Sequence, residues 1–221
     1  SNPYIIKEGE LKSAGTNLEL MSSDGTVTIP ENVTKIGAGA FSSLVGLKTV
    51  IIPGTVKEVG ANAFSYNKTL EKVIMQEGTE IIGEQAFYEC TSLSEINLPD
   101  TINSVGKFSM VNSKITKLDV PASLKTIGPY AFFCLEELQT VNIPEGVETI
   151  RYYAFDSCKK LETITIPSTV TNIENGAFAS CNSLTQINLK TKDFIYKDGM
   201  LIPKDGSRII FASKKLIENI D

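Results

Sequence analysis

Residues 149–167 read Thr149-Ile150-Arg151-Tyr152-Tyr153-Ala154-Phe155-Asp156-Ser157-Cys158-Lys159-Lys160-Leu161-Glu162-Thr163-Ile164-Thr165-Ile166-Pro167. The stretch is one copy of a unit that recurs every 23 residues along most of the chain. One column of the unit is phenylalanine, and its members are separated by 23, 23, 23, 22, 23 and 23 residues: Phe41, Phe64, Phe87, Met110, Phe132, Phe155 and Phe178. A fixed period between about 20 and 50 residues is the signature of stacked repeats. The sequence therefore predicts a solenoid in which residues one period apart are spatial neighbours.

Each unit predicts three short elements. Residues 163–166 alternate between threonine and isoleucine, which is typical of a short strand with one buried face, and successive copies would pair as a parallel sheet. A second pair of inward residues, such as Val147 and Ile150, predicts a second short strand. The segment from Ala154 has apolar residues at spacings of three, which predicts a short helical turn with Phe155 inside. Proline ends most of the first strands because it cannot donate to a ladder: Pro53, Pro99, Pro121, Pro144 and Pro167.

Two departures from the pattern are informative. A glycine column is replaced by Arg151 and Glu174 in the last two repeats, so we expect glycine to be chosen there for space and not for a positive φ. Arg151 and Glu174, one repeat apart, are placed to form an ion pair. The fourth repeat has Ser109 and Met110 in place of Ala and Phe, and it lacks one residue before Ile115. We expect a local kink or change of curvature there.

The ends of the chain do not follow the repeat. Residues 4–11 and 194–201 each resemble a strand, a turn with glycine and a second strand, and a third strand is expected at 208–211. We assign residues 1–29 to an N-terminal capping hairpin, 30–190 to a seven-repeat solenoid and 191–221 to a C-terminal hairpin module. Such modules would cover the open ends of the stack. An alternative is that repeat blocks and hairpins alternate in a longer parent protein.

Composition excludes several functions. The net charge of −5 offers no basic surface for nucleic acid or anionic membranes, and no apolar run approaches the ~18 residues of a membrane span. The chain has no histidine, the side chain that most often serves as a general base, so we expect no enzyme, cofactor or metal site. The chain starts with Ser-Asn-Pro, and we expect a mature or trimmed protein whose export signal has been removed.

The four cysteines suggest buried thiols. Cys90, Cys158 and Cys181 share one repeat position and Cys134 lies one residue before it, with spacings unlike any zinc motif. Only Cys158 and Cys181 are stacked closely enough for a disulfide, but two side chains that both point inward rarely reach disulfide geometry. We therefore expect small buried side chains that fill a slot in the core.

The unit Val-x-x-Ile-Gly-x-x-Ala-Phe-x-x-Cys-x-x-Leu-x-x-Ile-x-Ile-Pro resembles the BspA-type leucine-rich repeat over residues 27–190. The resemblance implies an α/β leucine-rich-repeat solenoid with a parallel ladder on one face and short helical turns and second strands on the others, flanked by hairpin modules. It also implies a secreted or cell-surface bacterial protein that recognises a protein partner, such as a host matrix or plasma protein. We expect a monomer, with no nucleic acid bound and no membrane insertion.

Two surfaces are candidates for binding. The first is the outward face of the strand ladder, which we expect to be concave: Ile51, Lys72, Ile74, Glu95, Asn97, Lys117, Asp119, Asn142, Thr165 and Asn188. The second is a ladder of aromatic side chains in the middle repeats: Phe108, Tyr130 and Tyr153, with Tyr152 and Phe133 beside them. A solvated sheet face and a purely structural aromatic stack are the corresponding alternatives. A spacer that presents other domains and carbohydrate binding by the aromatic ladder remain alternative functions.

Overall fold

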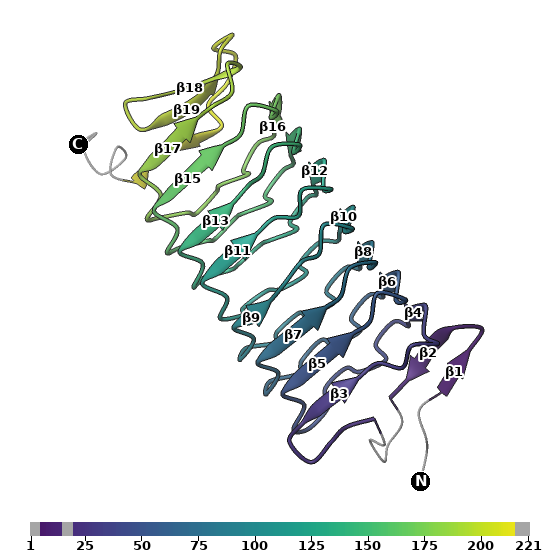
Figure 1. Ribbon diagram of the computed structural model, residues 1–221. Helices are drawn as coiled ribbons and strands as arrows, with labels where there is room; N and C mark the ends of the chain where they lie inside the picture. The colour runs from purple at the N-terminus through teal and green to yellow at the C-terminus, as the bar shows by residue number, and fades with distance from the viewer. Residues whose placement is uncertain (1–4, 15–19, 215–221) are drawn as a thin grey trace.

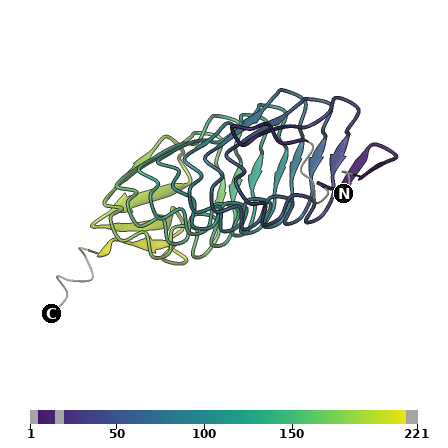
Figure 2. The same cartoon turned by 90° about the horizontal axis from the view of Figure 1, so that it is seen from below.

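The computed structural model describes residues 5–14 and 20–214, and it shows a chain wound into stacked coils (Figure 1). Each coil contributes one strand to a front sheet and one to a second sheet, and the coils follow one another along a single axis (Figure 2). The N-terminal hairpin lies at one end of the stack and the C-terminal hairpin at the other. The predicted solenoid is confirmed.

The front sheet is the parallel ladder predicted from the alternating segments. Most of its strands pair with the copy one period later, as Val50 does with Val73 and Ile164 with Ile187. Most inward residues are buried and the outward residues are more exposed, because successive side chains of a strand point to opposite faces. The strands are β3 (Thr26–Thr28), β5 (Thr49–Ile52), β7 (Lys72–Met75), β9 (Glu95–Ile96), β11 (Lys117–Asp119), β13 (Thr140–Asn142), β15 (Thr163–Ile166) and β17 (Gln186–Leu189).

The second sheet consists of two-residue strands, as predicted for the second pair of inward residues. They also pair in parallel, one period apart, as Ile36 does with Val59 and Ile150 with Ile173. The strands are β4 (Lys35–Ile36), β6 (Glu58–Val59), β8 (Ile81–Ile82), β10 (Ser104–Val105), β12 (Thr126–Ile127), β14 (Thr149–Ile150) and β16 (Asn172–Ile173).

The predicted helical turn is wrong, because the described part of the repeats contains no helix. The N–H of Phe155 donates to the carbonyl oxygen of Ala177 in the next coil (2.8 Å) and not to a carbonyl four residues earlier. Tyr153 and Ser157 have φ values of 58° and 64°, and this left-handed conformation at two positions per coil prevents a helix from propagating. The architecture is therefore a β-solenoid, and the α/β class is corrected.

Phenylalanine rings stacked along the axis form the centre of the core. The rings of Phe41 and Phe64 are 5.1 Å apart with an interplanar angle of 11°, and Phe155 and Phe178 are 5.8 Å apart at 10°. All the phenylalanines of the column are fully buried. Met110 interrupts the stack in the fourth repeat and is also fully buried. A flexible thioether side chain can fill the irregular space that a planar ring would not.

The cysteine column lines a polar slot beside the rings. The thiols of Cys90 and Cys181 each donate to the carbonyl oxygen of a phenylalanine in the preceding coil, at 3.1 Å in both cases. Asn67 occupies the same column, is fully buried, and donates through Nδ2 to the carbonyl oxygens of Phe41 and Phe64. All four cysteines are free; Cys90, Cys158 and Cys181 are buried as predicted, whereas Cys134 is partly exposed.

The glycine column serves packing, as predicted. None of its members has a positive φ. A Cβ on Gly83 would lie 2.8 Å from the nitrogen of Ala61, and one on Gly106 would lie 2.5 Å from the nitrogen of Glu84. The coils therefore approach too closely here for a side chain. Near the C-terminal end the approach relaxes, and Arg151 and Glu174 form the expected ion pair at 2.9 Å.

Hairpins lie at both ends of the stack. At the N-terminus β1 (Ile5–Lys7) pairs antiparallel with β2 (Glu10–Ser13), and Leu11 of β2 continues the second sheet by pairing with Ile36. At the C-terminus β18 (Phe194–Lys197), β19 (Met200–Pro203) and β20 (Phe211–Ala212) form a separate antiparallel sheet. The third strand is shorter and starts later than predicted. Tyr4 and residues 215–221, which the predicted end modules include, lie outside the described residues.

Candidate binding surface

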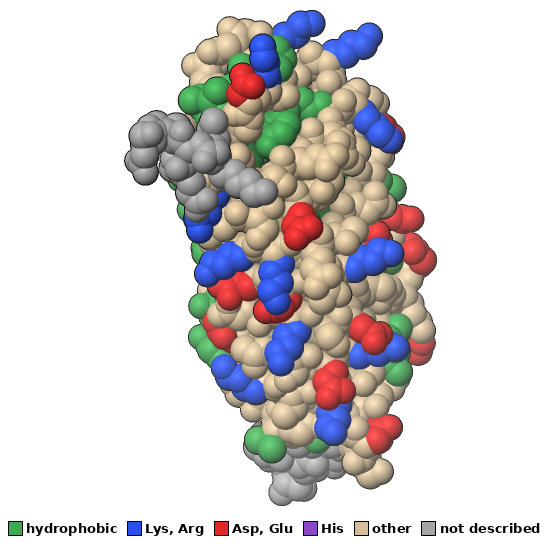
Figure 3. Space-filling view, turned by 90° about the vertical axis from the view of Figure 1, so that its left-hand side faces the viewer, with side chains coloured by type: hydrophobic (Ala, Val, Ile, Leu, Met, Phe, Trp, Pro, Cys, Tyr) green, Lys and Arg blue, Asp and Glu red, His purple; other side chains and the backbone are tan. Residues whose placement is uncertain are grey.

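The front face, meaning the outward side chains of the front sheet, carries charges of both signs. Lys72 and Glu95, on adjacent strands, form an ion pair at 3.3 Å, and Lys117 pairs with Asp119 of its own strand at 4.0 Å. Figure 3 shows acidic and basic side chains interspersed along the molecule and not gathered by sign. The front face therefore offers no broad field of a single charge.

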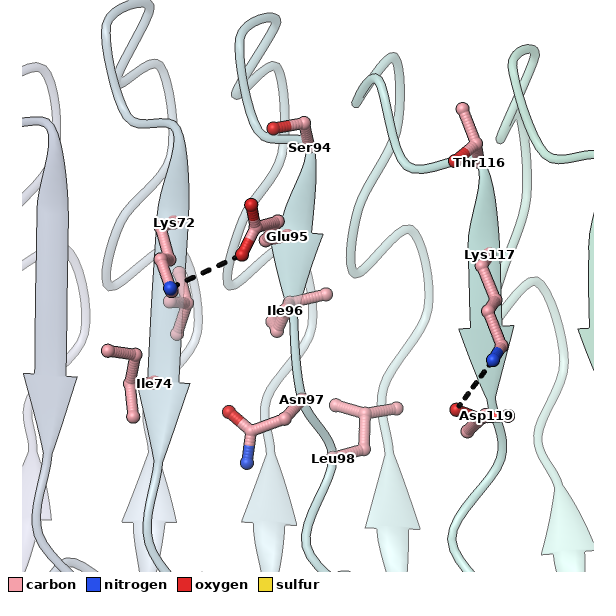
Figure 4. Close-up of a pocket in the computed structure, with 11 residues that line it drawn as sticks. Lys72, Ile74, Ser94, Glu95, Ile96, Asn97, Leu98, Thr116, Lys117 and Asp119 are labelled. Atoms are coloured by element: carbon pink, nitrogen blue, oxygen red, sulfur yellow. Dashed lines mark ion pairs between the residues drawn. The ribbon is translucent and has the colours of Figure 1, made fainter.

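The front ladder is interrupted between β9 and β11, and again between β13 and β15. The structure gives no hydrogen bond between the described strands β9 and β11, and each pairs only with its other neighbour. Close-up Figure 4 shows β11 standing further from β9 than β7 does. The fourth repeat, where the sequence predicted a kink or change of curvature, therefore contains a break in the sheet. The second sheet is interrupted at the same level, between β10 and β12.

A missing residue accompanies the break between β9 and β11. In a regular coil the N–H of Asn62 donates to the carbonyl oxygen of Glu84. Glu84 directly precedes Gln85, which occupies the position of Asn62 in the next coil. In the fourth coil the N–H of Phe108 donates to the carbonyl oxygen of Tyr130, and Tyr130 itself occupies the position of Phe108 in the next coil. The pairing has therefore slipped by one residue immediately before β11.

The serine of this coil repairs part of the slip. In a regular coil the N–H of Phe64 donates to the carbonyl oxygen of Ala86. The equivalent carbonyl, that of Ala131, instead accepts the hydroxyl of Ser109 at 2.6 Å. The hydroxyl thus supplies the hydrogen bond that the displaced main chain does not make, which explains why serine replaces alanine here.

A cleft of about 520 Å³ lies over the break (Figure 4). Six residues of the predicted front face line it: Lys72, Ile74, Glu95, Asn97, Lys117 and Asp119. Ile96 and Leu98 also line it and are partly exposed, although their equivalents in the preceding coil, Val73 and Met75, are 1% and 2% exposed. The sequence indicated inward positions for Ile96 and Leu98. The shortened spacing before Ile115 was the only sign that they would be uncovered.

On the β7 side of β9, the side chain of Asn97 satisfies the main-chain groups of Met75. Its Oδ1 accepts the main-chain N–H of Met75 at 2.8 Å, and its Nδ2 donates to the carbonyl oxygen of Met75 at 2.6 Å. The side-chain amide thereby replaces the strand pairing that ends after Ile96. On the β11 side no comparable substitute is present among the described residues.

The other residues of the predicted face lie along the same ladder. Ile51 pairs with Ile74 and extends the apolar side of the cleft toward the N-terminus. Asn142 and Thr165 line a second hollow of about 370 Å³ between β13 and β15. There the inward residues Val141 and Ile143 stay 8% and 6% exposed, so the core is not opened. Asn188 accepts a hydrogen bond from Gln186 on the last front strand.

The predicted aromatic ladder exists as a stack, here called the aromatic column: Phe108, Tyr130 and Tyr153. Its ring centroids are 5.0 and 5.2 Å apart, with interplanar angles of 38° and 16°. Tyr152 and Phe133 contact Tyr130 edge-on. A Cβ on Gly176 would lie 2.3 Å from the Tyr153 ring, so this glycine leaves room for the last tyrosine. The ring faces therefore contact one another, and mainly ring edges are left for solvent.

The backbone of the aromatic column has a left-handed conformation. Phe108, Tyr130 and Tyr153 have φ values of 59°, 54° and 58°. Gly39, Asn62 and Gly176 occupy the same column, and glycine and asparagine are the residues that tolerate this conformation best. Glycine and asparagine in this column are thus the sequence signal for a left-handed turn.

Two titratable side chains beside the aromatic column are held toward their neutral forms. Burial, reinforced by Glu136, raises the pKa of the Cys134 thiol to about 11. Burial also raises the pKa of Asp156. A thiol with a raised pKa is a poor nucleophile at neutral pH. The thiol of Cys134 is therefore not placed as a reactive nucleophile.

Comparison with known proteins identifies the family of this repeat fold. The chain is similar to a leucine-rich cell-surface protein of Faecalibacterium prausnitzii A2-165, with 27% identity, a TM-score of 0.69, and 84% of this chain and 56% of that one covered. It is also similar to a leucine-rich repeat protein of Bacteroides ovatus ATCC 8483, with 26% identity, a TM-score of 0.69, and 85% of this chain and 51% of that one covered. The leucine-rich repeat protein of T. pallidum, at 23% identity and a TM-score of 0.71 over 83% and 87%, shares the fold.

This chain spans about half the length of the first two of these structures. No curated protein sequence matches it. In the described residues no helix is long and apolar enough to cross a membrane. The model of the BspA type leucine rich repeat region matches residues 21–133 and 110–200, which is most of the sequence. The chain therefore belongs to the BspA-type leucine-rich repeat family.

Proposed function

We propose that the chain is a non-catalytic recognition module of a secreted or cell-surface protein and that its front face binds a protein partner. The observation that carries this proposal is the cleft between β9 and β11. It brings six residues of the front face together over two core residues that the broken ladder leaves partly exposed. The family relationship supports the proposal, because leucine-rich solenoids generally mediate protein interactions.

A passive spacer does not require such an opening. Leaving Ile96 and Leu98 in contact with water forfeits the roughly 25 cal/mol per Å² that burial of apolar surface contributes. The front ladder also forgoes the hydrogen bonds between β9 and β11. A surface that binds a partner recovers both contributions on association, whereas a spacer does not.

Catalysis is not supported by the carboxylates in the cleft. Glu95 is paired with Lys72, and Asp119 is paired with Lys117. Hydrolytic carboxylate pairs need one acid with a raised pKa facing one ionised partner across the reacting bond. Here each carboxylate is ion-paired with a lysine, and the two do not face each other as an acid and a base.

The test uses immobilised blood-plasma proteins and basement-membrane extract as probes. We expect the chain to bind at least one component, and the double variant Lys72→Glu/Lys117→Glu to bind it at least tenfold more weakly. Lys159→Glu/Lys160→Glu is the matched control, because it reverses the same charges in two ion pairs outside the cleft. Equal loss in both variants would reject the front face as the site, and no binding to either probe would favour a spacer.

Carbohydrate binding is the second candidate, and the geometry of the aromatic column argues for a structural role instead. Sugars stack on open aromatic faces, whereas the faces of Tyr130 are covered by Phe108 and Tyr153. A glycan array with the wild-type chain tests the alternative directly. We expect no glycan to bind in a manner that depends on these rings.

A further inference from the structure

We propose that the cleft recognises an extended, largely uncharged polypeptide segment by strand addition, with the main chain of the segment pairing with the free edge of β11. This inference rests on the proposed function and specifies the chemistry of its partner. The segment lies along the break, parallel to the strands that flank it.

The register of the intact rungs identifies the main-chain groups that are free. The carbonyl oxygen of Thr116 accepts from Thr140 of β13, and the N–H of Val120 donates to Asn142, so the even-numbered residues that flank β11 face β13. Because main-chain groups alternate in direction along a strand, the N–H and C=O groups of Lys117 and Asp119 face β9. The structure gives them no partner on β9. An unpaired row of this kind is a template for an added strand.

The floor of the cleft adds a requirement for apolar side chains. Ile96 and Leu98 are two residues apart on the same side of the chain and are both partly exposed. An added strand presents every second side chain to the same face. A segment with apolar residues at positions i and i+2 would therefore cover both. The hollow between β13 and β15 lacks this feature, because Val141 and Ile143 are buried.

The charges at the rim restrict the partner further. The cleft has two lysines and two acidic residues, and each lysine already faces a carboxylate. A phosphate-rich or sulfated ligand would need unpaired positive charge, which these walls do not offer. The central part of the segment is therefore uncharged, and its affinity should depend weakly on ionic strength.

The extent of the cleft sets the length of the segment. The β9 side of the lining runs from Ser94 to Leu98. At about 3.3 Å per residue, a segment of about five residues spans this length. Linear heptapeptides are therefore long enough to occupy the site.

The experiment selects linear heptapeptides from a displayed random library on the whole chain and then measures the affinity of the synthetic peptide. Lys117→Pro removes the main-chain N–H that faces the cleft and leaves the bonds of β11 to β13 in place. Lys117→Ala is the matched control, because it removes the same side chain and keeps the N–H. We expect Lys117→Ala to bind within about threefold of wild type and Lys117→Pro to bind at least tenfold more weakly, as expected from losing a hydrogen bond. Equal affinities of the two variants would overturn the proposal.

Two further measurements do not depend on the folding of the proline variant. Hydrogen exchange at the amides of Lys117 and Asp119 in the wild-type chain should slow when the peptide is bound. N-methylation of either the odd-numbered or the even-numbered residues of the peptide should weaken binding, and N-methylation of the other set should not, because only every second amide faces β11. Unchanged exchange at both amides, no phase dependence, or failure to enrich any peptide would each overturn strand addition.

The outcomes separate this inference from the proposed function. If the plasma or matrix component needs Lys72 and Lys117 but the proline and alanine variants behave alike, the front face binds by side chains and strand addition is rejected. If peptides bind by strand addition while no plasma or matrix component binds, the partner class of the proposed function is rejected and the recognition chemistry stands.

Discussion

The side-chain amide of Asn97 takes both main-chain groups of Met75, accepting its N–H at 2.8 Å and donating to its carbonyl oxygen at 2.6 Å. The side chain thereby makes the two hydrogen bonds that a neighbouring strand would make, and β9 can diverge from β7 without leaving the main-chain groups of Met75 unpaired. We predict that Asn97→Ala lowers the free energy of unfolding by about 1–3 kcal/mol, because two buried-edge hydrogen bonds lose their partner. Urea denaturation monitored by circular dichroism measures this.

Asn97→Asp provides the matched variant for that prediction. A carboxylate can still accept the N–H of Met75, but it faces the carbonyl oxygen with no proton to donate. It should therefore be less stable than wild type at pH 7 and recover part of the loss at pH 3, where the carboxyl is protonated. Wild-type stability in the alanine variant would show that water satisfies Met75 equally well.

The polar slot supports a second prediction, with opposite signs at two positions of one column. Asn67 is fully buried and makes three hydrogen bonds to neighbouring main chain: with Leu44, Phe41 and Phe64. Asn67→Ala should cost about 2–4 kcal/mol, because it leaves these groups unpaired and opens a cavity. Ser113 is 2% exposed, and its hydroxyl finds no partner among the described residues. Ser113→Ala should leave stability unchanged or raise it by about 1 kcal/mol. Thermal denaturation of the two variants side by side would contradict the assignment if both lost stability equally.

The sequence predicted those features of the fold that depend on the same contact being repeated in every coil. The phenylalanine, strand and glycine columns repeat because the same contact recurs in every coil, so the stacking, the parallel register and the core followed from the period. The arc from Tyr153 to Ser157 did not. Its apolar spacing suits a helix, but its two left-handed residues direct the N–H groups to the next coil. Gly39 and Gly176 indicate a left-handed backbone at this position, but the aromatic residues in the repeats between them are not typical of that conformation.

The candidate site was only half visible for a related reason. The outward residues of the face, such as Lys72 and Lys117, follow from strand alternation. The cleft follows from one missing residue, whose effect on pairing depends on how the fourth coil is accommodated in three dimensions. Neither the slip at Phe108 nor the exposure of Ile96 can be derived from the period itself.

Space between the coils gives a third prediction. Gly106→Ala should lower stability by about 1–3 kcal/mol, because its Cβ would lie 2.5 Å from the nitrogen of Glu84 and the coils would have to separate. Gly128→Ala is the control, since its Cβ would meet only the carbonyl oxygen of Val105 at 3.2 Å. We expect that variant to stay within about 0.5 kcal/mol of wild type. Equal effects in urea denaturation would mean that glycine is required for reasons other than space.

The buried thiols make stability depend on alkaline pH. Burial raises the pKa of Cys90 from an ordinary value of 9.0 to about 12 and raises that of Cys158 as well. Below pH 9 the thiols are protonated in both states, so they add no pH dependence. Between pH 9 and about 12 the unfolded chain releases these protons while the folded chain keeps them, so stability falls as the pH rises. Denaturation curves at pH 8, 9.5 and 10.5 should show a smaller fall in Cys90→Ala than in wild type. A parallel fall would assign the effect to lysine and tyrosine titration.

The aromatic column supplies the last prediction, which separates backbone strain from ring stacking. Tyr153→Asn and Tyr153→Val both remove the ring that stacks on Tyr130, but they differ in how well they tolerate a φ of 58°. Asparagine accepts the left-handed conformation readily, and a β-branched residue does not. We expect the asparagine variant to remain within about 1 kcal/mol of wild type, because lost stacking is offset by relief of the backbone, and the valine variant to be at least about 1 kcal/mol less stable than it. Binding of the plasma or matrix component should be unchanged in Tyr130→Asn/Tyr153→Asn. If that double variant folds normally and loses binding, the recognition surface is the aromatic column and not the front face.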